Sequence, residues 1–219
     1  MIRFDEIKNN AVVRACIETG DENLMAISYT EHSFPHAMRV SNDATRILQQ
    51  LGYDDRTCEL GMIAGYIHDI GNTVNRSNHA QSGAIMAFDL LTRMGMEPNE
   101  VATVVAAIGH HDEGTAHPVN AVAAALILSD KGDVRRTRVR DRDTVSSDIH
   151  DRVNYAVEKA RLEILPADKI AMLELKIDTE ICPVMEYFEI FIGRMILCRQ
   201  AAEFFGLCFE LKINGTRLL

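Results

Sequence analysis

The chain has 219 residues, enough for one domain with a sizeable core. Its 47% hydrophobic and 25% charged residues are typical of a soluble globular protein, and its net charge of −9 argues against a long nucleic acid as partner, because an acidic surface repels phosphates. The N-terminus lacks a signal-like apolar stretch, no apolar run is long enough to span a bilayer, and the five scattered cysteines include no CxxC pair. We therefore expect a cytoplasmic protein with reduced thiols that does not bind membranes.

Apolar residues recur with helical spacing through the first 131 residues. The pattern predicts helices over 4–19, 21–30, 33–51, 54–70, 79–94, 98–109 and 119–131. Gly52 and Gly95 are natural helix ends, and Pro98 suits a helix start. Residues 131–148, rich in arginine and aspartate, are interpreted as a surface segment.

Beyond residue 148 the periodicity changes. A short helix over 148–159 is followed by alternating residues that predict a hairpin of strands 161–165 and 170–177. A long helix over 181–205 and a strand over 207–213 complete the chain. The predicted fold is mainly α, a helical bundle with a small C-terminal antiparallel or mixed β-sheet. We expect residues 1–148 to form the helical part with the functional site, and residues 149–219 to pack on the same body.

Imidazole and carboxylate side chains occur in an ordered series between these helices. The series comprises His36, His68, Asp69, His79, His110, His111 and Asp130. Such groups bind borderline divalent metals, and seven of them exceed what one ion takes, so the series predicts two metal ions. Iron, manganese, zinc, nickel and cobalt all remain open.

Asp69 is the predicted bridging ligand, because a carboxylate can bind two cations through its two oxygens and a neutral imidazole cannot. His110 and His111 point about 100° apart on a helix, so both can bind metal only if the helix ends there. Gly109 and Gly114 permit such an end, and His111 is the stronger candidate. His32, one turn before His36, lies either in the site or beside it.

The arrangement resembles the HD-domain superfamily of metal-dependent phosphohydrolases. The matching segments are His36-x-x-Arg39-Val40, His68-Asp69-Ile70-Gly71, His79-x-x-Ser82-Gly83-Ala84, Ile108-Gly109-His110-His111 and Leu128-Ser129-Asp130. In that family the first histidine, the His-Asp pair and the last aspartate hold one metal, and further histidines mark the binuclear branches. The resemblance implies metal binding by His36, His68, Asp69, His79, His111 and Asp130, with His110 as a further candidate.

Two binuclear branches are most similar. The cyclic-di-GMP phosphodiesterases called HD-GYP carry a lysine where this chain has Asn72, and a Gly-Tyr-Pro that is absent after His111. The diadenosine polyphosphate hydrolases share the His-x-x-x-Gly-Ala element and the final aspartate. The resemblance implies hydrolysis of a phosphate ester or anhydride of a small, nucleotide-like substrate by a metal-bridging hydroxide. The alternatives are a mixed-valence di-iron oxygenase of the same superfamily and a regulatory module with a vestigial site.

Further candidates for the chemistry are basic and acidic neighbours of the ligands. Arg39 and Lys131 could hold a phosphate, and Asp112 or Glu113 could assist proton transfer to the leaving group. The arginines of 131–142 are either substrate contacts or a solvated or dimer-facing segment. One face of the helix over 181–205 is a candidate homodimer contact, and packing on the strands is the alternative.

Overall fold

The computed structural model describes residues 1–146 and 148–218, and the first 131 of them are helical, as predicted. This part contains α1 (Phe4–Lys8), α2 (Ala11–Ala26), α3 (Phe34–Gln50), α4 (Asp55–Ile67), α5 (His79–Arg93), α6 (Pro98–Gly109) and α7 (Ala121–Lys131), with a single 3-10 turn, η1 (Ile70–Thr73), after α4. Two further 3-10 turns, η2 (Arg136–Arg138) and η3 (Asp143–Ser146), lie in the segment after α7. No helix in the described ranges is both long enough and apolar enough to cross a membrane.

The N-terminal helix boundaries differ from the prediction. The predicted helix over 4–19 is broken, because the side chain of Asn10 accepts hydrogen bonds from the backbone N–H groups of Val12 and Val13 and so starts α2. The predicted helix over 21–30 does not exist separately, since α2 continues to Ala26 and Ser28 has a positive φ of 62°. Asn10 is a typical N-cap residue, but the apolar pattern continues across it and so predicted one unbroken helix.

The C-terminal part forms a mixed four-stranded sheet. It contains α8 (Ile149–Ala156), β1 (Val157–Leu165), β2 (Ile170–Ile177), α9 (Val184–Phe204), β3 (Cys208–Ile213) and β4 (Thr216–Arg217). The strand order is β1-β2-β3-β4, with β1 antiparallel to β2, β2 parallel to β3, and β3 antiparallel to β4. The parallel pair is possible because α9 carries the chain back across the sheet. The predicted helix over 148–159 ends earlier, at Ala156, and the first strand begins at Val157.

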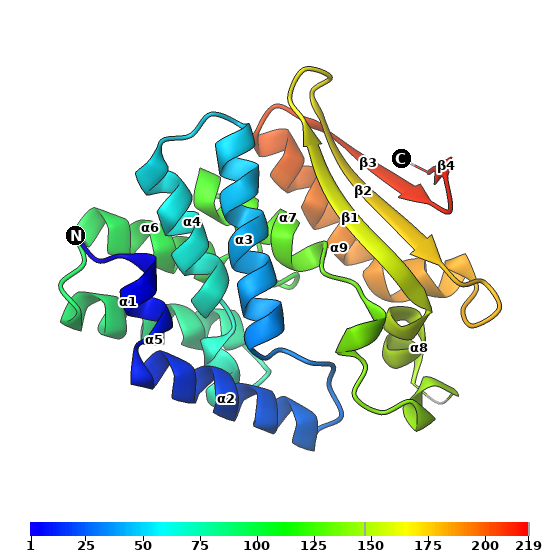
Figure 1. Cartoon of the computed structure of the whole chain (residues 1–219), viewed down its shortest axis with the longest axis horizontal. Coiled ribbons are helices and arrows are strands. Elements are labelled where there is room, and N and C mark those ends of the chain that lie inside the picture. The colour runs from blue at the N-terminus through cyan, green and yellow to red at the C-terminus, as the bar shows by residue number, and fades with distance from the viewer. Residues whose placement is uncertain (147, 219) are drawn as a thin grey trace.

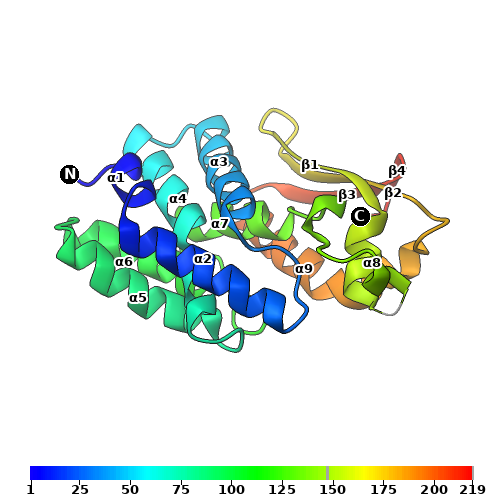
Figure 2. The ribbon, with the colours of Figure 1, turned by 60° about the horizontal axis from the view of Figure 1, so that its bottom comes forward.

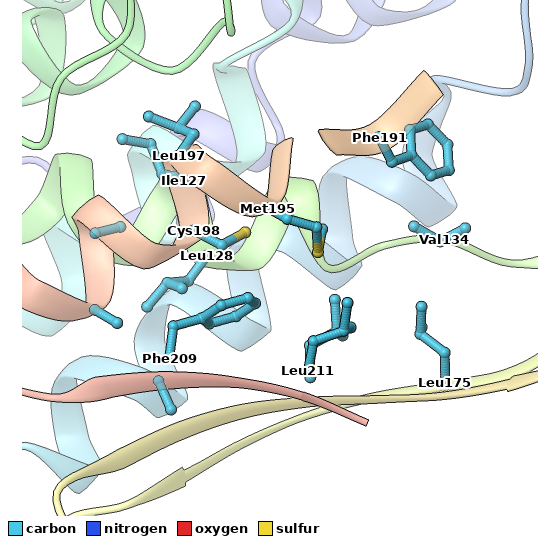
Figure 3. Close-up of a cluster of buried hydrophobic side chains, with 14 of the residues drawn as sticks. Ile127, Leu128, Val134, Leu175, Phe191, Met195, Leu197, Cys198, Phe209 and Leu211 are labelled. Carbon is cyan, nitrogen blue, oxygen red and sulfur yellow. The ribbon is translucent and has the colours of Figure 1, made fainter. Parts of the chain in front are cut away.

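The helical body and the sheet are joined through α7 and α9. Both views place the sheet, α8 and α9 on one side of the molecule and α1, α2 and α4–α6 on the other (Figure 1; Figure 2). Phe209 of the sheet points toward Leu128 of α7, Leu211 points toward Met195 of α9, and Leu175 points toward Val134 (Figure 3). Because α7 also packs against α3, α4 and α6, one continuous set of helices holds the sheet and the site together.

Candidate metal centre

Five helix ends converge on one point of the helical body. His36 lies in the first turn of α3, His79 begins α5, and Asp130 lies at the end of α7. His68 and Asp69 directly follow the end of α4, and His111 lies two residues after the end of α6. The four histidines are at most 2% exposed. The helix ends, not one helix face, therefore position the side chains.

Four of these side chains surround a first point. Nε2 of His36 lies 3.4 Å from Oδ1 of Asp130, Nε2 of His68 lies 3.3 Å from Oδ2 of Asp69, and the two cross pairs are 3.7 Å apart. Ligands bound about 2.1 Å from one ion lie roughly 3–3.5 Å from each other. Nε2 of His36, Nε2 of His68 and Oδ2 of Asp69 are buried and have no hydrogen-bond partner. A cation at this point would satisfy all three atoms, so the donor set fits a metal.

The other oxygen of Asp69 faces a second group. Oδ1 of Asp69 lies 3.3 Å from Nε2 of His79 and 3.8 Å from Nε2 of His111, and these two nitrogens are 3.2 Å apart. Asp69 thus presents one carboxylate oxygen to each cluster. We call these the His36 cluster (His36, His68, Asp69 and Asp130) and the His79 cluster (His79, His111 and Asp69).

The opposite nitrogen of every ring has a fixed acceptor. Nδ1 of His68, His79 and His111 lies 2.8, 3.1 and 2.6 Å from the backbone oxygens of the residues three positions earlier. Nδ1 of His36 lies 2.8 Å from Oδ2 of Asp133. With Nδ1 donating, each Nε2 carries the free lone pair, which is the tautomer that binds a metal.

Asp133 was missed by the sequence reasoning. Its carboxylate is 1% exposed and also accepts from Nε of Arg39 at 3.0 Å and from Nε of Arg135 at 2.9 Å. Burial would raise the pKa of Asp133, but its hydrogen bond to His36 and the nearby Arg138 and Arg135 hold it well below the usual value. Its position three residues after Asp130, at a helix end, was the only signal in the sequence.

The arginine segment is structural in this arrangement. The Arg138 side chain is 5% exposed; its Nη1 donates to the backbone oxygen of Asp133 and its Nε to that of Glu31. Arg135 binds Glu31 as well as Asp133, and Arg140 binds Asp21. The interpretation of 131–148 as a surface segment is therefore wrong at Arg138, which is buried. The side chains of Arg135, Arg138 and Arg140 connect the region after α7 to the end of α2 and the loop before α3.

Arg39 and Lys131, the two predicted phosphate donors, differ in their surroundings. Arg39 pairs with Asp133, on the outer side of His36, and its side chain is 43% exposed. Lys131 is buried, with Nζ 2.8 Å from Oδ2 of Asp130, 3.5 Å from Glu113 and 3.9 Å from Asp112. Burial would lower the pKa of Lys131, but Asp130 and Glu113 raise it overall, so the ammonium stays charged. Of these two basic side chains, only Lys131 contacts a predicted metal ligand, which is Asp130.

The acidic residues after the His79 cluster form ion pairs. Burial would raise the pKa of Glu113, but Lys131 and Arg194 lower it to about 2. Nε of Arg194 lies 2.7 Å from Glu113. Asp112 lies 3.9 Å from Nζ of Lys131, and its side chain is about as exposed as that of Glu113, 30% against 29%. Of the two predicted candidates for proton transfer, Asp112 is the less firmly paired.

His110 and His32 lie outside both clusters. The helix ends at Gly109, as double ligation required, but the histidine, aspartate and glutamate atoms that gather in the described part of the chain do not include those of His110. Its Nδ1 is buried without a partner. His32 has its ring 5.4 Å from that of His36, and its Nδ1 lies 2.7 Å from the backbone oxygen of Thr30. His32 is therefore beside the His36 cluster.

The glycine of the His-Asp-Ile-Gly motif has a packing reason. A Cβ on Gly71 would lie 2.0 Å from the backbone oxygen of His79 and 2.5 Å from the backbone nitrogen of Gly83. Only a residue without a side chain lets the turn after Asp69 approach α5 so closely. Gly71 and Gly83 therefore determine the separation of His68-Asp69 from His79.

The two aspartates of the centre lie among basic groups. Burial would raise the pKa of Asp69, but His68, His111 and His79 hold it well below its usual range. Burial would also raise the pKa of Asp130, but Lys131, His36 and His68 hold it well below its usual range. Burial would lower the pKa of His68, but Asp69 and Asp130 raise it to about 10, so the surroundings of this ring favour a positive charge and suit a cation.

Comparisons with known proteins identify the family of the chain. The HD domain family matches residues 34–151, which is more than half of the chain, so the chain belongs to the HD-domain family. An uncharacterised protein of Methanocaldococcus jannaschii is 28% identical over 40% of this chain, and the match spans 40% of that relative's length. The crystal structure of a predicted HD superfamily hydrolase from an uncultured Thermotogales bacterium is 29% identical, with a TM-score of 0.48 over 60% of this chain and 68% of that chain.

Proposed function

We propose that this protein is a binuclear, metal-dependent phosphohydrolase that cleaves a phosphate ester or anhydride of a small, nucleotide-like substrate. The observation that carries the proposal is the division of the centre by Asp69, which turns one oxygen to the His36 cluster and the other to the His79 cluster. Two adjacent cation sites sharing a carboxylate are the arrangement used for displacement at phosphorus.

In this proposal His36, His68, Asp69 and Asp130 hold one ion, and Asp69, His79 and His111 hold the other. Bound there, two divalent cations would supply an activated water and positive charge for the phosphoryl oxygens. His111 and His79 supply neutral nitrogens, which leaves the net positive charge of the ions available for the phosphate. The incomplete ligand set of the His79 cluster leaves room for water and substrate.

Other residues of the chain orient these ligands and assist proton transfer. Lys131 fixes the orientation of Asp130 through Oδ2, so that Oδ1 faces the cluster. Asp133 orients His36, and burial of the imidazoles excludes competing water. In this proposal Asp112, partly exposed beside Lys131, assists proton transfer to the leaving oxygen.

The experiment is a substrate panel with the manganese- or iron-loaded protein. The panel holds p-nitrophenyl phosphate, bis-p-nitrophenyl phosphate, mononucleotides and dinucleoside polyphosphates. We expect chelator-sensitive phosphate release that is lost in His111→Ala and kept in His117→Ala, which removes an exposed histidine from the following loop. Absence of release from the whole panel, with oxygen consumed on a phosphonate or polyol, would replace the hydrolase by the di-iron oxygenase.

A further inference from the structure

A cavity of about 490 Å³ lies beside the metal centre. Two of the residues that line it contact a ligand of the centre, since His32 lies next to His36 and Arg76 next to His79. Two others contact residues that hold a ligand. Arg138 contacts Asp133, which holds His36, and Glu113 contacts Lys131, which holds Asp130. The cavity has the size of a small-molecule site, and its lining includes direct neighbours of both clusters.

Arg76 is the unusual side chain of this cavity. Its Nη1 lies 3.3 Å from Nε2 of His79, the nitrogen that faces the second cluster, and its guanidinium lies over the ring of Tyr29 at 5.5 Å. No carboxylate in residues 1–146 or 148–218 forms a salt bridge with Arg76. The other two arginines of the cavity are already paired, Arg194 with Glu113 and Arg138 with Asp133.

An arginine without a counter-ion beside a cation site needs an anion. The guanidinium is always charged, has five donors and accepts no hydrogen bond. A cation on His79 would add like charge within a few ångströms, and only a negative group between the two offsets both. A phosphoryl oxygen meets this requirement, because it can bind the metal and accept from the guanidinium together.

The far wall of the cavity has the opposite character. It is formed by the start of α8 and the middle of α9, with Asp148, Asp151 and Asn154 beside Ile190. Asp148 already accepts hydrogen bonds from the backbone N–H groups of His150 and Asp151 at the start of α8. A carboxylate oxygen accepts hydrogen bonds, so Asp151 can select a hydroxyl or amino group. The C-terminal part of the chain therefore supplies a wall that suits the uncharged end of a ligand.

We propose that this cavity binds a phosphate monoester of a hydroxyl- or amino-bearing compound such as a nucleoside, with Arg76 holding a non-bridging phosphate oxygen and Asp151 accepting from the organic part. The proposal rests on the phosphohydrolase function and names its substrate class. It also assigns a role to α8 and α9, which complete the site that the helical body begins.

The first test is the binding of inorganic phosphate to the manganese-loaded protein, measured by calorimetry. Arg76→Gln should weaken binding by about 10- to 100-fold, the loss of one or two charge-assisted hydrogen bonds. Arg93→Gln is the matched control, because it makes the same charge change at an exposed position of α5. The metal content of Arg76→Gln should be no lower than that of the wild type. The bond that orients His79 goes to the backbone oxygen of Arg76, and the guanidinium near Nε2 adds only like charge to a bound cation.

The second test is selectivity. Asp151→Asn should lower the ratio of kcat/KM for a mononucleotide to kcat/KM for p-nitrophenyl phosphate by about tenfold, the effect of one hydrogen bond. A purely structural defect would lower kcat/KM for both substrates and leave their ratio unchanged. An unchanged ratio would therefore overturn the role of Asp151.

The results separate this proposal from the proposed function. Equal phosphate affinity of Arg76→Gln, Arg93→Gln and the wild type would overturn the role of Arg76, even if the enzyme hydrolyses phosphate esters. Conversely, loss of phosphate affinity in Arg76→Gln with no hydrolysis of any ester would support an anion pocket and reject the hydrolase. No phosphate binding by the wild type would overturn the pocket.

Discussion

Replacement of Asp133 by asparagine tests how the centre is held. The carboxylate serves His36 through Oδ2 and both Arg39 and Arg135 through Oδ1. Asparagine has one oxygen and one NH₂ group, so in either orientation its NH₂ group meets a donor, either the His36 ring or the two guanidinium groups. The change keeps the shape of the side chain and removes its charge.

We expect two effects of Asp133→Asn. Loss of an outer partner of a metal-binding histidine weakens metal binding by about 10- to 100-fold, which corresponds to about 1.4–2.8 kcal/mol. Loss of a buried carboxylate that pairs with arginines costs about 3 kcal/mol, the lower end of the usual range because Arg39 is 43% exposed. For a chain of this length that stability loss lowers Tm by about 6–12 °C.

The assay is a metal titration in competition with a chromophoric chelator, analysed for two sites. Only metal binding at the His36 cluster should weaken, since the rings of the His79 cluster are oriented by backbone oxygens. Asp89→Asn, which removes an exposed carboxylate on α5, is the control and should behave as the wild type. Unchanged affinity at both sites in a folded Asp133→Asn protein would refute the argument that this carboxylate orients His36.

Three further changes test the packing. Gly71→Ala should lower the free energy of unfolding by about 3 kcal/mol or more, because the new Cβ drives α5 away from the preceding turn, and it should abolish metal binding at the His79 cluster. Gly114→Ala, whose Cβ would meet nothing within 4 Å, should have neither effect. Equal melting temperatures of the two variants would contradict this. Burial raises the pKa of Cys198 to about 12, so at pH 8 a thiol reagent should modify the exposed Cys208 and leave Cys198 unmodified until unfolding. Leu211→Ala, at the fully buried centre of the sheet, should cost about 2–5 kcal/mol in a single cooperative transition, and two separate transitions would show that the sheet unfolds on its own.

The sequence predicted the elements better than their boundaries. The glycines that end α3 and α5 have positive φ, which is why Gly52 and Gly95 marked those ends correctly. The strands β2 and β3 were predicted within a residue, because apolar and charged residues alternate over 173–177 and 209–213. The parallel pairing of β2 with β3 could not be predicted, since it depends on where α9 returns the chain.

The histidine and aspartate series was visible because each member stands at a helix end, where the apolar pattern stops. The partners that orient these residues were not visible. Asp133 and Arg76 belong to polar loops that contain many similar residues, and only their three-dimensional neighbours distinguish them. The cavity wall from α8 and α9 was equally hidden, because Asp148, its first residue, follows Arg76 by 72 residues of chain.

The number of metal ions bound per chain tests the central claim most directly. We predict two ions per chain in the manganese-saturated wild type and none in Asp69→Ala after the same dialysis, because both clusters lose an oxygen ligand. His117→Ala, with an exposed histidine removed, should keep both. One ion per chain in the wild type, or two retained by Asp69→Ala, would contradict a binuclear centre bridged by Asp69.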